Sequence, residues 1–276
     1  MSILENIIYG LISGMAEFLP VSSSAHQVIL RYMFGIESRN FLQEFLVHTG
    51  LLLAVLISCR DSIIRFSRQN SIFNVSKRKN KRKPESVDYY SLRLLKTATF
   101  PLIIGLILLF ITIKTEDNLL AVVGFFLINA LILFFAAHSQ QGNRDARSMT
   151  GLDGIIMGLL GCLSVFPGIS RTAAISSYTT LRGADLRNTV NWTFLLGIPT
   201  ILFLIVFDVI GLASVGLGVL SFSAVIGYIL SGIVAFCSGY FAISVLFIIL
   251  SHSGFSCFAY YSLGSALFTF ILYLIT

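Results

Sequence analysis

The chain has 276 residues, of which 56% are hydrophobic and 12% are charged, and its formal net charge is +6. Soluble domains carry about a quarter charged residues, so this composition excludes an ordinary soluble protein and indicates an integral membrane protein. The positive charge does not indicate nucleic-acid binding. About half of the basic residues lie between Arg60 and Arg93, and the densest run, SKRKNKRK, contains no aromatic residue.

The first predicted element is a helical hairpin over Ile3–Met33 that enters and leaves the membrane on one face, because Pro20 interrupts its apolar run. It contains the segment EFLPVSSSAH, from Glu17 to His26. Proline ends one half-helix and is well suited to start the next. Serine hydroxyls after the break are expected to cap the second half-helix. Its free N–H groups and positive dipole end would then form an anion site inside the protein.

Six apolar runs are predicted to cross the membrane, which takes roughly 20 residues. They are Phe45–Cys59 (the shortest), Leu92–Ile113, Leu119–Ala137, Trp192–Leu212, Leu220–Leu250 and Cys257–Ile275. Lys and Arg concentrate in cytoplasmic loops, so the Arg60–Arg93 loop is predicted to be cytoplasmic, and alternation places the C-terminus outside. Contact of the basic run with anionic lipid is an alternative interpretation.

A second hairpin is predicted over Gly154–Leu181, interrupted at Pro167-Gly168 within the segment FPGISRTAA. The order is therefore hairpin, three spans, hairpin, three spans, and the odd number of spans places the hairpins in opposite orientations. This pattern predicts an all-α integral membrane fold of one domain over residues 1–276, with inverted repeats at about 1–137 and 153–276. Transporter folds of this kind place their sites near mid-membrane at broken helices.

Ionisable residues at membrane depth are costly and usually functional, which singles out Glu17, His26 and Arg171. The guanidinium of Arg171 suits bidentate contact with phosphate. Either Ser23 or His26 is the candidate nucleophile, with Glu17 as general base or orienting group. Two helix N-termini with Arg171 between them would suit a phosphate or diphosphate.

Each of these residues also has a structural interpretation. Glu17 and Arg171 would serve as a buried pair that holds the repeats together, and His26 as a packed core histidine. Ser22, Ser23, Ser24 and Ser170 would be helix caps only. His48, at the start of a predicted span, is interpreted as a packed or interfacial polar residue.

At these residues the sequence resembles the bacterial undecaprenyl pyrophosphate phosphatase family of the bacitracin-resistance type. EFLPVSSSAH matches the family's first signature and PGISRT the opening of its second, and FLVHTGLLLAVLISCR and WTFLLGIPTI extend the likeness along nearly the whole chain. The resemblance implies hydrolysis of undecaprenyl diphosphate to the monophosphate carrier of cell-wall synthesis, in the bacterial plasma membrane. The residues it implies are Glu17, Ser23, His26 and Arg171 as catalytic groups, and Ser22, Ser170 and Thr172 as substrate-binding groups.

The resemblance leaves the cofactor open: Mg²⁺ or Ca²⁺, weakly bound at Glu17 or bridged by substrate, is the expectation. Four positions depart from the family pattern. Ser13 and Gly161 stand where acids or amides are expected, Ile175 where a hydroxyl is expected, and Ser262 where an arginine is expected. One charge-assisted contact to a transferring phosphoryl group is worth about 3 kcal/mol or more, so reduced activity is predicted. The alternative is a non-catalytic paralogue that binds or translocates a polyprenyl phosphate.

Overall fold

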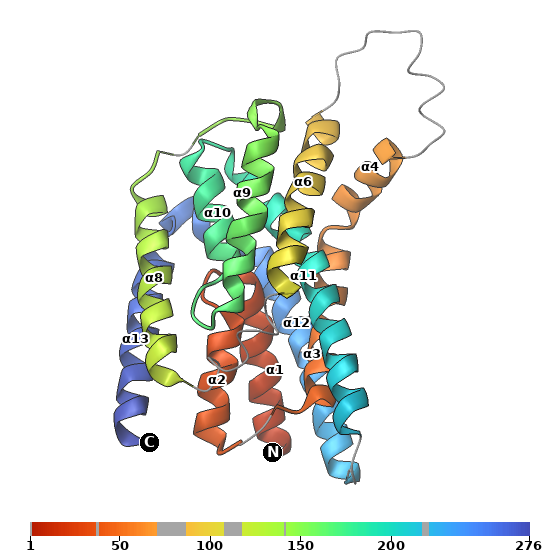
Figure 1. Cartoon of the computed structure of the whole chain (residues 1–276), viewed down its shortest axis with the longest axis vertical. Coiled ribbons are helices and arrows are strands. Elements are labelled where there is room, and N and C mark those ends of the chain that lie inside the picture. The colour runs from red at the N-terminus through yellow and green to blue at the C-terminus, as the bar shows by residue number, and fades with distance from the viewer. Residues whose placement is uncertain (1, 37–38, 71–86, 108–117, 141, 217–220) are drawn as a thin grey trace.

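The computed structural model describes residues 2–36, 39–70, 87–107, 118–140, 142–216 and 221–276 (Figure 1). Within these ranges the regular elements are helices, and one isolated β-bridge pairs Arg144 with Ala184. In chain order the helices are α1 (Ile3–Phe18), α2 (Ser23–Phe34), α3 (Phe41–Ser58), α4 (Arg60–Asn70), α6 (Val87–Ile107), α8 (Leu119–Ala137), η3 (Ala146–Ser148), α9 (Gly151–Cys162), η4 (Leu163–Val165), α10 (Arg171–Leu181), α11 (Leu186–Val215), α12 (Phe222–Ser253) and α13 (Ser256–Ile275).

Six of the described helices, α3, α6, α8, α11, α12 and α13, are long and apolar enough to cross a membrane. The predicted all-α membrane fold is confirmed, and the protein is a multi-pass membrane protein. The predicted span Leu119–Ala137 coincides with α8, and each of the other five overlaps one of these helices. The SKRKNKRK run and residues 108–113 of the second predicted span lie outside the described residues.

The stretch after Arg60, predicted as loop, begins instead with helix α4. The reason is a short apolar stripe. Ile63 and Phe66, three positions apart, face the same side of α4 and pack against the main core, where Phe66 is 7% exposed. Three-residue spacing places two side chains on one helix face, so α4 is amphipathic, with basic residues between its apolar contacts.

Two short helical hairpins, α1–α2 and α9–α10, approach each other from opposite ends of the molecule (Figure 1). α1 packs against α12, and α9 packs against α6. Both contacts depend on glycine: a Cβ at Gly10 would lie 2.2 Å from the carbonyl oxygen of Ser231, and one at Gly158 would lie 2.2 Å from that of Ala98. Small residues let membrane helices pack this closely. The hairpin tips therefore sit at fixed positions in the middle of the bundle.

Candidate active site where the two hairpins meet

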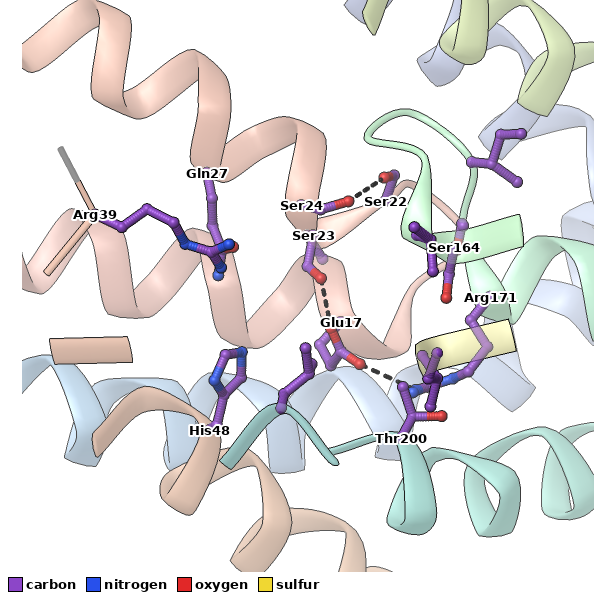
Figure 2. A pocket seen from close by; sticks show the side chains of 16 residues that line it. Glu17, Ser22, Ser23, Ser24, Gln27, Arg39, His48, Ser164, Arg171 and Thr200 are labelled. Carbon is purple, nitrogen blue, oxygen red and sulfur yellow. Dashed lines mark hydrogen bonds and ion pairs between the residues drawn. The ribbon is translucent and has the colours of Figure 1, made fainter. Parts of the chain in front are cut away.

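A pocket of about 700 Å³, mouth included, lies between the hairpin tips and helices α3, α6 and α11 (Figure 2). It is lined by Ala16, Glu17, Ser22, Ser23, Ser24, Gln27, Arg39, His48, Leu106, Ser164, Val165, Ile169, Ser170, Arg171, Thr200 and Leu204. The structure therefore brings together five of the seven predicted site residues and leaves His26 and Thr172 outside this lining.

Glu17 is the centre of the polar contacts in this pocket. Ser23 donates a hydrogen bond to Glu17 Oε2 over 2.5 Å, and Arg171 Nη2 lies 3.1 Å from Glu17 Oε1. Glu17 sits in the last turn of α1, while Ser23 and Arg171 are the first residues of α2 and α10. The breaks at the two prolines thus bring the starts of α2 and α10 to the carboxylate at the end of α1, and Figure 2 shows the contacts of Glu17 with Ser23 and Arg171.

Arg171 is held by the start of α10 but keeps donor capacity. Ser170 caps this helix by accepting a hydrogen bond from the N–H of Ala173 at 3.3 Å. The guanidinium passes against Gly197, where a Cβ would lie only 2.9 Å from Nη2. Its Nε is buried and has no hydrogen-bond partner among the described residues. An unpaired buried donor is costly, so this group is suited to receive an anionic ligand.

The predicted capping of α2 by Ser22 is wrong. Ser22 occupies the N-cap position, but its hydroxyl accepts from the N–H of Gly168 across the interface at 3.0 Å and contacts Ser24 at 3.3 Å. Its φ of 70° places a non-glycine residue in the left-handed region, which costs about 1–3 kcal/mol and is commonest at functional sites. Ser22 therefore ties one hairpin tip to the other instead of satisfying its own helix.

Asn129, near the middle of α8, also joins the two tips, and the sequence interpretation missed it. Its amide donates to the carbonyl of Pro20 and to the hydroxyl of Ser262, and its oxygen accepts from the N–H of Ser170. The available signal was a lone asparagine in the apolar run 119–137. Ser262, where an arginine was expected, is fully buried in this contact.

His26 faces away from the pocket, toward α8 and α13. Its Nδ1 donates to the carbonyl of Ser22 at 2.8 Å, because a carbonyl can only accept. Its Nε2 contacts the hydroxyl of Tyr261 at 2.8 Å, and the two rings stack. Both ring nitrogens are therefore occupied. Thr172 points back to the carbonyl of Glu17 at 3.4 Å, so it supports the α1 tip.

The other wall of the pocket carries a second polar cluster that the sequence interpretation did not assign to the site. His48 on α3 contacts Asp208 on α11 through Nδ1 at 2.6 Å, and Arg39 and Gln27 lie beside them (Figure 2). Asp208 is fully buried. Its signal was a single carboxylate inside the apolar run 192–212.

The four departures from the expected pattern occupy tightly packed positions. Ser13 is fully buried and accepts a hydrogen bond from Gln27 at 3.3 Å. Gly161 faces Ile175, whose Cδ1 would lie 3.3 Å from a Cβ built at position 161. An apolar side chain from α10 thus fills space beside the position where a longer polar side chain was expected.

Among the described residues, no three His, Cys, Asp or Glu side chains are close enough to hold a metal ion. Glu17 is the one carboxylate in the pocket lining, and both of its oxygens already contact Ser23 and Arg171. These side chains by themselves do not fit a divalent cation. A cation there would need oxygens of a bound ligand for most of its coordination, so the Mg²⁺ or Ca²⁺ expectation stays a prediction.

Comparison with known proteins gives consistent matches. Residues 6–268 match the family model described as bacitracin resistance protein BacA. An undecaprenyl-diphosphatase of Alkaliphilus metalliredigens is 31% identical over 99% of this chain and 100% of its own length. Undecaprenyl-diphosphatase 1 of Shouchella clausii is 35% identical over 86% of this chain and 87% of its own length. An undecaprenyl-diphosphatase of Treponema denticola is 33% identical over 95% of this chain and 94% of its own length.

Proposed function

The chain belongs to the bacitracin resistance protein BacA family, and we infer that it is an undecaprenyl-diphosphatase. It is a membrane hydrolase that removes the terminal phosphate of undecaprenyl diphosphate and releases undecaprenyl phosphate. The observation that links this function to a site is the contact of Glu17 with both Ser23 and Arg171 at the hairpin tips. A hydroxyl that is hydrogen-bonded to a carboxylate, beside a guanidinium with an unpaired N–H donor, is suited to phosphoryl transfer.

In the proposed reaction, Ser23 Oγ attacks the terminal phosphorus while its proton passes to Glu17 Oε2. The bond from that phosphorus to the bridging oxygen breaks, and undecaprenyl phosphate leaves with the electron pair. Glu17 passes this proton to the departing undecaprenyl phosphate and is ionised again. Water then attacks the phosphorus of the phosphoserine while one of its protons passes to Glu17 Oε2. The bond from that phosphorus to Ser23 Oγ breaks, Oγ takes the proton from Glu17, and inorganic phosphate departs. Arg171 and the α2 and α10 N-termini offset the charge on the phosphoryl oxygens.

Ser23 is preferred over His26 as the nucleophile in this proposal. Ser23 lines the pocket and contacts the carboxylate that would accept its proton. His26 lies outside the lining, with both ring nitrogens engaged by Ser22 and Tyr261. We propose that His26 supports the α2 tip through the carbonyl of Ser22.

We also propose that the two hairpins are re-entrant and that the halves form an inverted repeat. Each half places its first hairpin helix against the middle span of the other half, α1 on α12 and α9 on α6. The span that follows each hairpin meets its counterpart, α3 on α11, and the last spans α8 and α13 also pair. This exchange pattern is the one expected from a two-fold axis in the membrane plane.

Helix length supports the re-entrant assignment. α2 has 12 residues and α10 has 11, so each rises roughly 17–18 Å, a little over half of the hydrocarbon core of about 30 Å. We propose that α4 and the start of α6 lie at the cytoplasmic face of the bacterial plasma membrane and that the C-terminus lies outside. Reporter fusions near Asn70 and at Thr276 that report the same side would contradict this orientation.

The decisive experiment is phosphate release from undecaprenyl diphosphate by the purified protein in detergent. The expected result is slow but measurable hydrolysis that Ser23→Ala and Glu17→Gln reduce by about 10²-fold or more, while His26→Gln retains more activity than either. Addition and chelation of Mg²⁺ and Ca²⁺ in the same assay test the cofactor expectation. A protein that binds the lipid diphosphate but releases no phosphate would contradict the enzyme assignment and leave the lipid-binding alternative.

A further inference from the structure

We propose that the wall of the pocket formed by Gln27, Arg39 and His48, called here the His48 end, is a second phosphoryl subsite. At this end His48 and Arg39 would bind the phosphoryl group that is retained on the lipid, while the terminal group meets Ser23 and Arg171. The inference rests on the proposed function because it assigns the second half of the diphosphate to a place in the same pocket.

The first support is the way in which Asp208 orients His48. The carboxylate Oδ2 of Asp208 can only accept, so the 2.6 Å contact means that Nδ1 of His48 carries a proton. This fixes the ring and leaves Nε2, on the opposite edge, for the pocket that His48 lines. The side chains of His48 and Asp208 are 5% and 0% exposed. When the ring carries a second proton on Nε2, it can donate from both nitrogens, to Asp208 on one edge and to an anion in the pocket on the other.

The second support is a matched set of charges around Arg39. Its Nε lies 4.0 Å from Glu44 Oε1, and its guanidinium lies 5.7 Å from the ring centroid of Phe207. Tyr9 donates to the same carboxylate over 2.5 Å. These contacts hold a guanidinium at the pocket wall with its side chain 20% exposed. Glu44 balances Arg39, and Asp208 balances His48 whenever that ring carries both protons, so positive charge can stay at this wall before an anion binds.

The third support is the division of the pocket into two ends. In Figure 2, His48, Arg39 and Gln27 lie on one side of Glu17, and Arg171 and Thr200 lie on the other. A diphosphate presents two linked anionic groups, and charge-assisted hydrogen bonds from separate cations suit such a ligand. The His48 end would therefore select diphosphates over monophosphates.

The test compares the affinity of inorganic pyrophosphate and inorganic phosphate for the full-length protein in detergent, measured by calorimetry. We expect Arg39→Gln and His48→Gln each to weaken pyrophosphate binding about tenfold, which equals about 1.4 kcal/mol, while phosphate binding changes less than twofold. Asp208→Asn keeps an acceptor for Nδ1 but removes the charge, so a smaller loss of about threefold is expected, again for pyrophosphate alone. Arg171→Lys is the matched variant at the other end and should weaken both anions.

The same variants are then compared in turnover. The expected result is a higher KM for undecaprenyl diphosphate with kcat nearly unchanged. Equal weakening of both anions, or no weakening of either by Arg39→Gln, would overturn the subsite. Arg39 is partly exposed, so Arg39→Gln tests the proposal even if His48→Gln does not fold. If the wild-type protein releases no phosphate, the proposed function fails. The effect of each variant on pyrophosphate affinity relative to phosphate affinity still tests the subsite in that case.

Discussion

Helix α10 carries an arginine at each end, and each arginine meets a carboxylate in a different kind of setting. At its first residue, Arg171 lies beside Glu17 of the opposite hairpin. At its C-cap, Arg182 donates from Nε to Asp153 of its own hairpin at 2.7 Å. Asp153 also accepts from Tyr178 and from both the N–H and the hydroxyl of Thr150.

The two pairs differ in how much of their hydrogen-bonding capacity is used by protein partners. The carboxylate of Asp153 receives four hydrogen bonds, so it closes the α9–α10 hairpin and has little left to offer a ligand. The guanidinium of Arg171 keeps Nε without a partner among the described residues and opens on a pocket. Buried polar groups that are left unpaired call for an explanation, and a phosphoryl ligand supplies one. The sequence motif PGISRT contains Arg171, whose pair with Glu17 leaves a donor unpaired. A ligand-binding site keeps such a donor open at a cost in stability.

The largest expected effect is at Arg171. Arg171→Ala should abolish hydrolysis, a loss of about 10²–10³-fold or more, because a preorganised donor to the transferring phosphoryl group is removed. Arg171→Lys keeps the charge but loses the planar fork, and it should recover less than a tenth of the wild-type rate. Phosphate release is measured per folded molecule, with the melting temperature in detergent as the check on folding.

Arg182→Ala is the matched control for this change, since it removes an arginine from the other end of the same helix. It should leave the rate per folded molecule within about twofold and lower the melting temperature, because a charge-assisted hydrogen bond to Asp153 is lost. Such a bond is worth about 1.5–3 kcal/mol, and the low end is expected here because the side chain of Arg182 is 42% exposed to solvent. Full activity of Arg171→Lys would mean that the Glu17–Arg171 contact serves the structure alone. Arg171 and Arg182, at the two ends of α10, would then have the same kind of role.

The second prediction concerns the pH dependence of the closed pair. Burial alone would raise the pKa of Asp153, but the hydrogen bonds from Arg182, Thr150 and Tyr178 outweigh it and hold the pKa well below the ordinary value of 3.8. A carboxylate with a lowered pKa stabilises the fold above its unfolded-state pKa, and this stability is lost as the pH falls through the folded-state pKa. Asp153→Asn should therefore cost about 1–3 kcal/mol at neutral pH.

The measurement is the melting temperature of wild type and Asp153→Asn across a pH series. The gap between them should be widest near neutral pH and should narrow as the pH is lowered below 3.8, because the unfolded wild-type chain then takes up a proton at Asp153 that the folded chain still resists. Activity per folded molecule should not change. A gap that is constant with pH would mean that Asp153 acts by packing alone.

The sequence was sufficient for much of this architecture and for one side of the site. Long apolar runs identify the spans because lipid requires about 20 apolar residues, and the proline breaks identify Glu17, Ser23 and Arg171 because charges at that depth are rare. The His48 end was not predicted, because His48 and Asp208 are 160 residues apart in the chain. Their meeting depends on how α3 packs on α11, which no local pattern encodes. The placement of His26 was missed for the same reason: only the packed structure shows which side of α2 faces the pocket.

The third prediction tests how strictly the open end is positioned. Gly197→Ala would place a methyl group 2.9 Å from Arg171 Nη2 and 3.3 Å from Cζ, so the guanidinium must move by a few tenths of an ångström. Misplacement of a reacting group by 1 Å costs about 10²-fold, so a fall of about tenfold in kcat/KM is expected. Stability should hold or rise, since alanine favours a helix over glycine by about 1 kcal/mol. Gly124→Ala on α8, with nothing within 4 Å of the added group, is the matched control and should leave kcat/KM unchanged.

The smallest expected effect lies between the two ends of α10, where Ile175 packs beside Gly161 of α9. A Cβ at position 161 would meet Leu102 Cδ1 at 2.9 Å and Ile175 Cδ1 at 3.3 Å. Overpacking costs about 1–3 kcal/mol, and the gain in helix propensity of about 1 kcal/mol offsets part of it, so Gly161→Ala should be mildly destabilising. Ile175→Val removes the facing methyl group and should cost about 0.5–1.5 kcal/mol by itself.

Because the second change creates room for the first, the double variant should lose less stability than the sum of the single losses, with a coupling of about 0.5 kcal/mol or more. The unfolding midpoints of the four proteins measure this directly. Neither change touches Arg171 or Glu17, so phosphate release per folded molecule should stay near the wild-type rate in all four. If relieving this contact instead alters the rate, the middle of α10 transmits strain between its ends, and the closed pair at Asp153 would then have to be counted among the groups that position the open pair at Glu17.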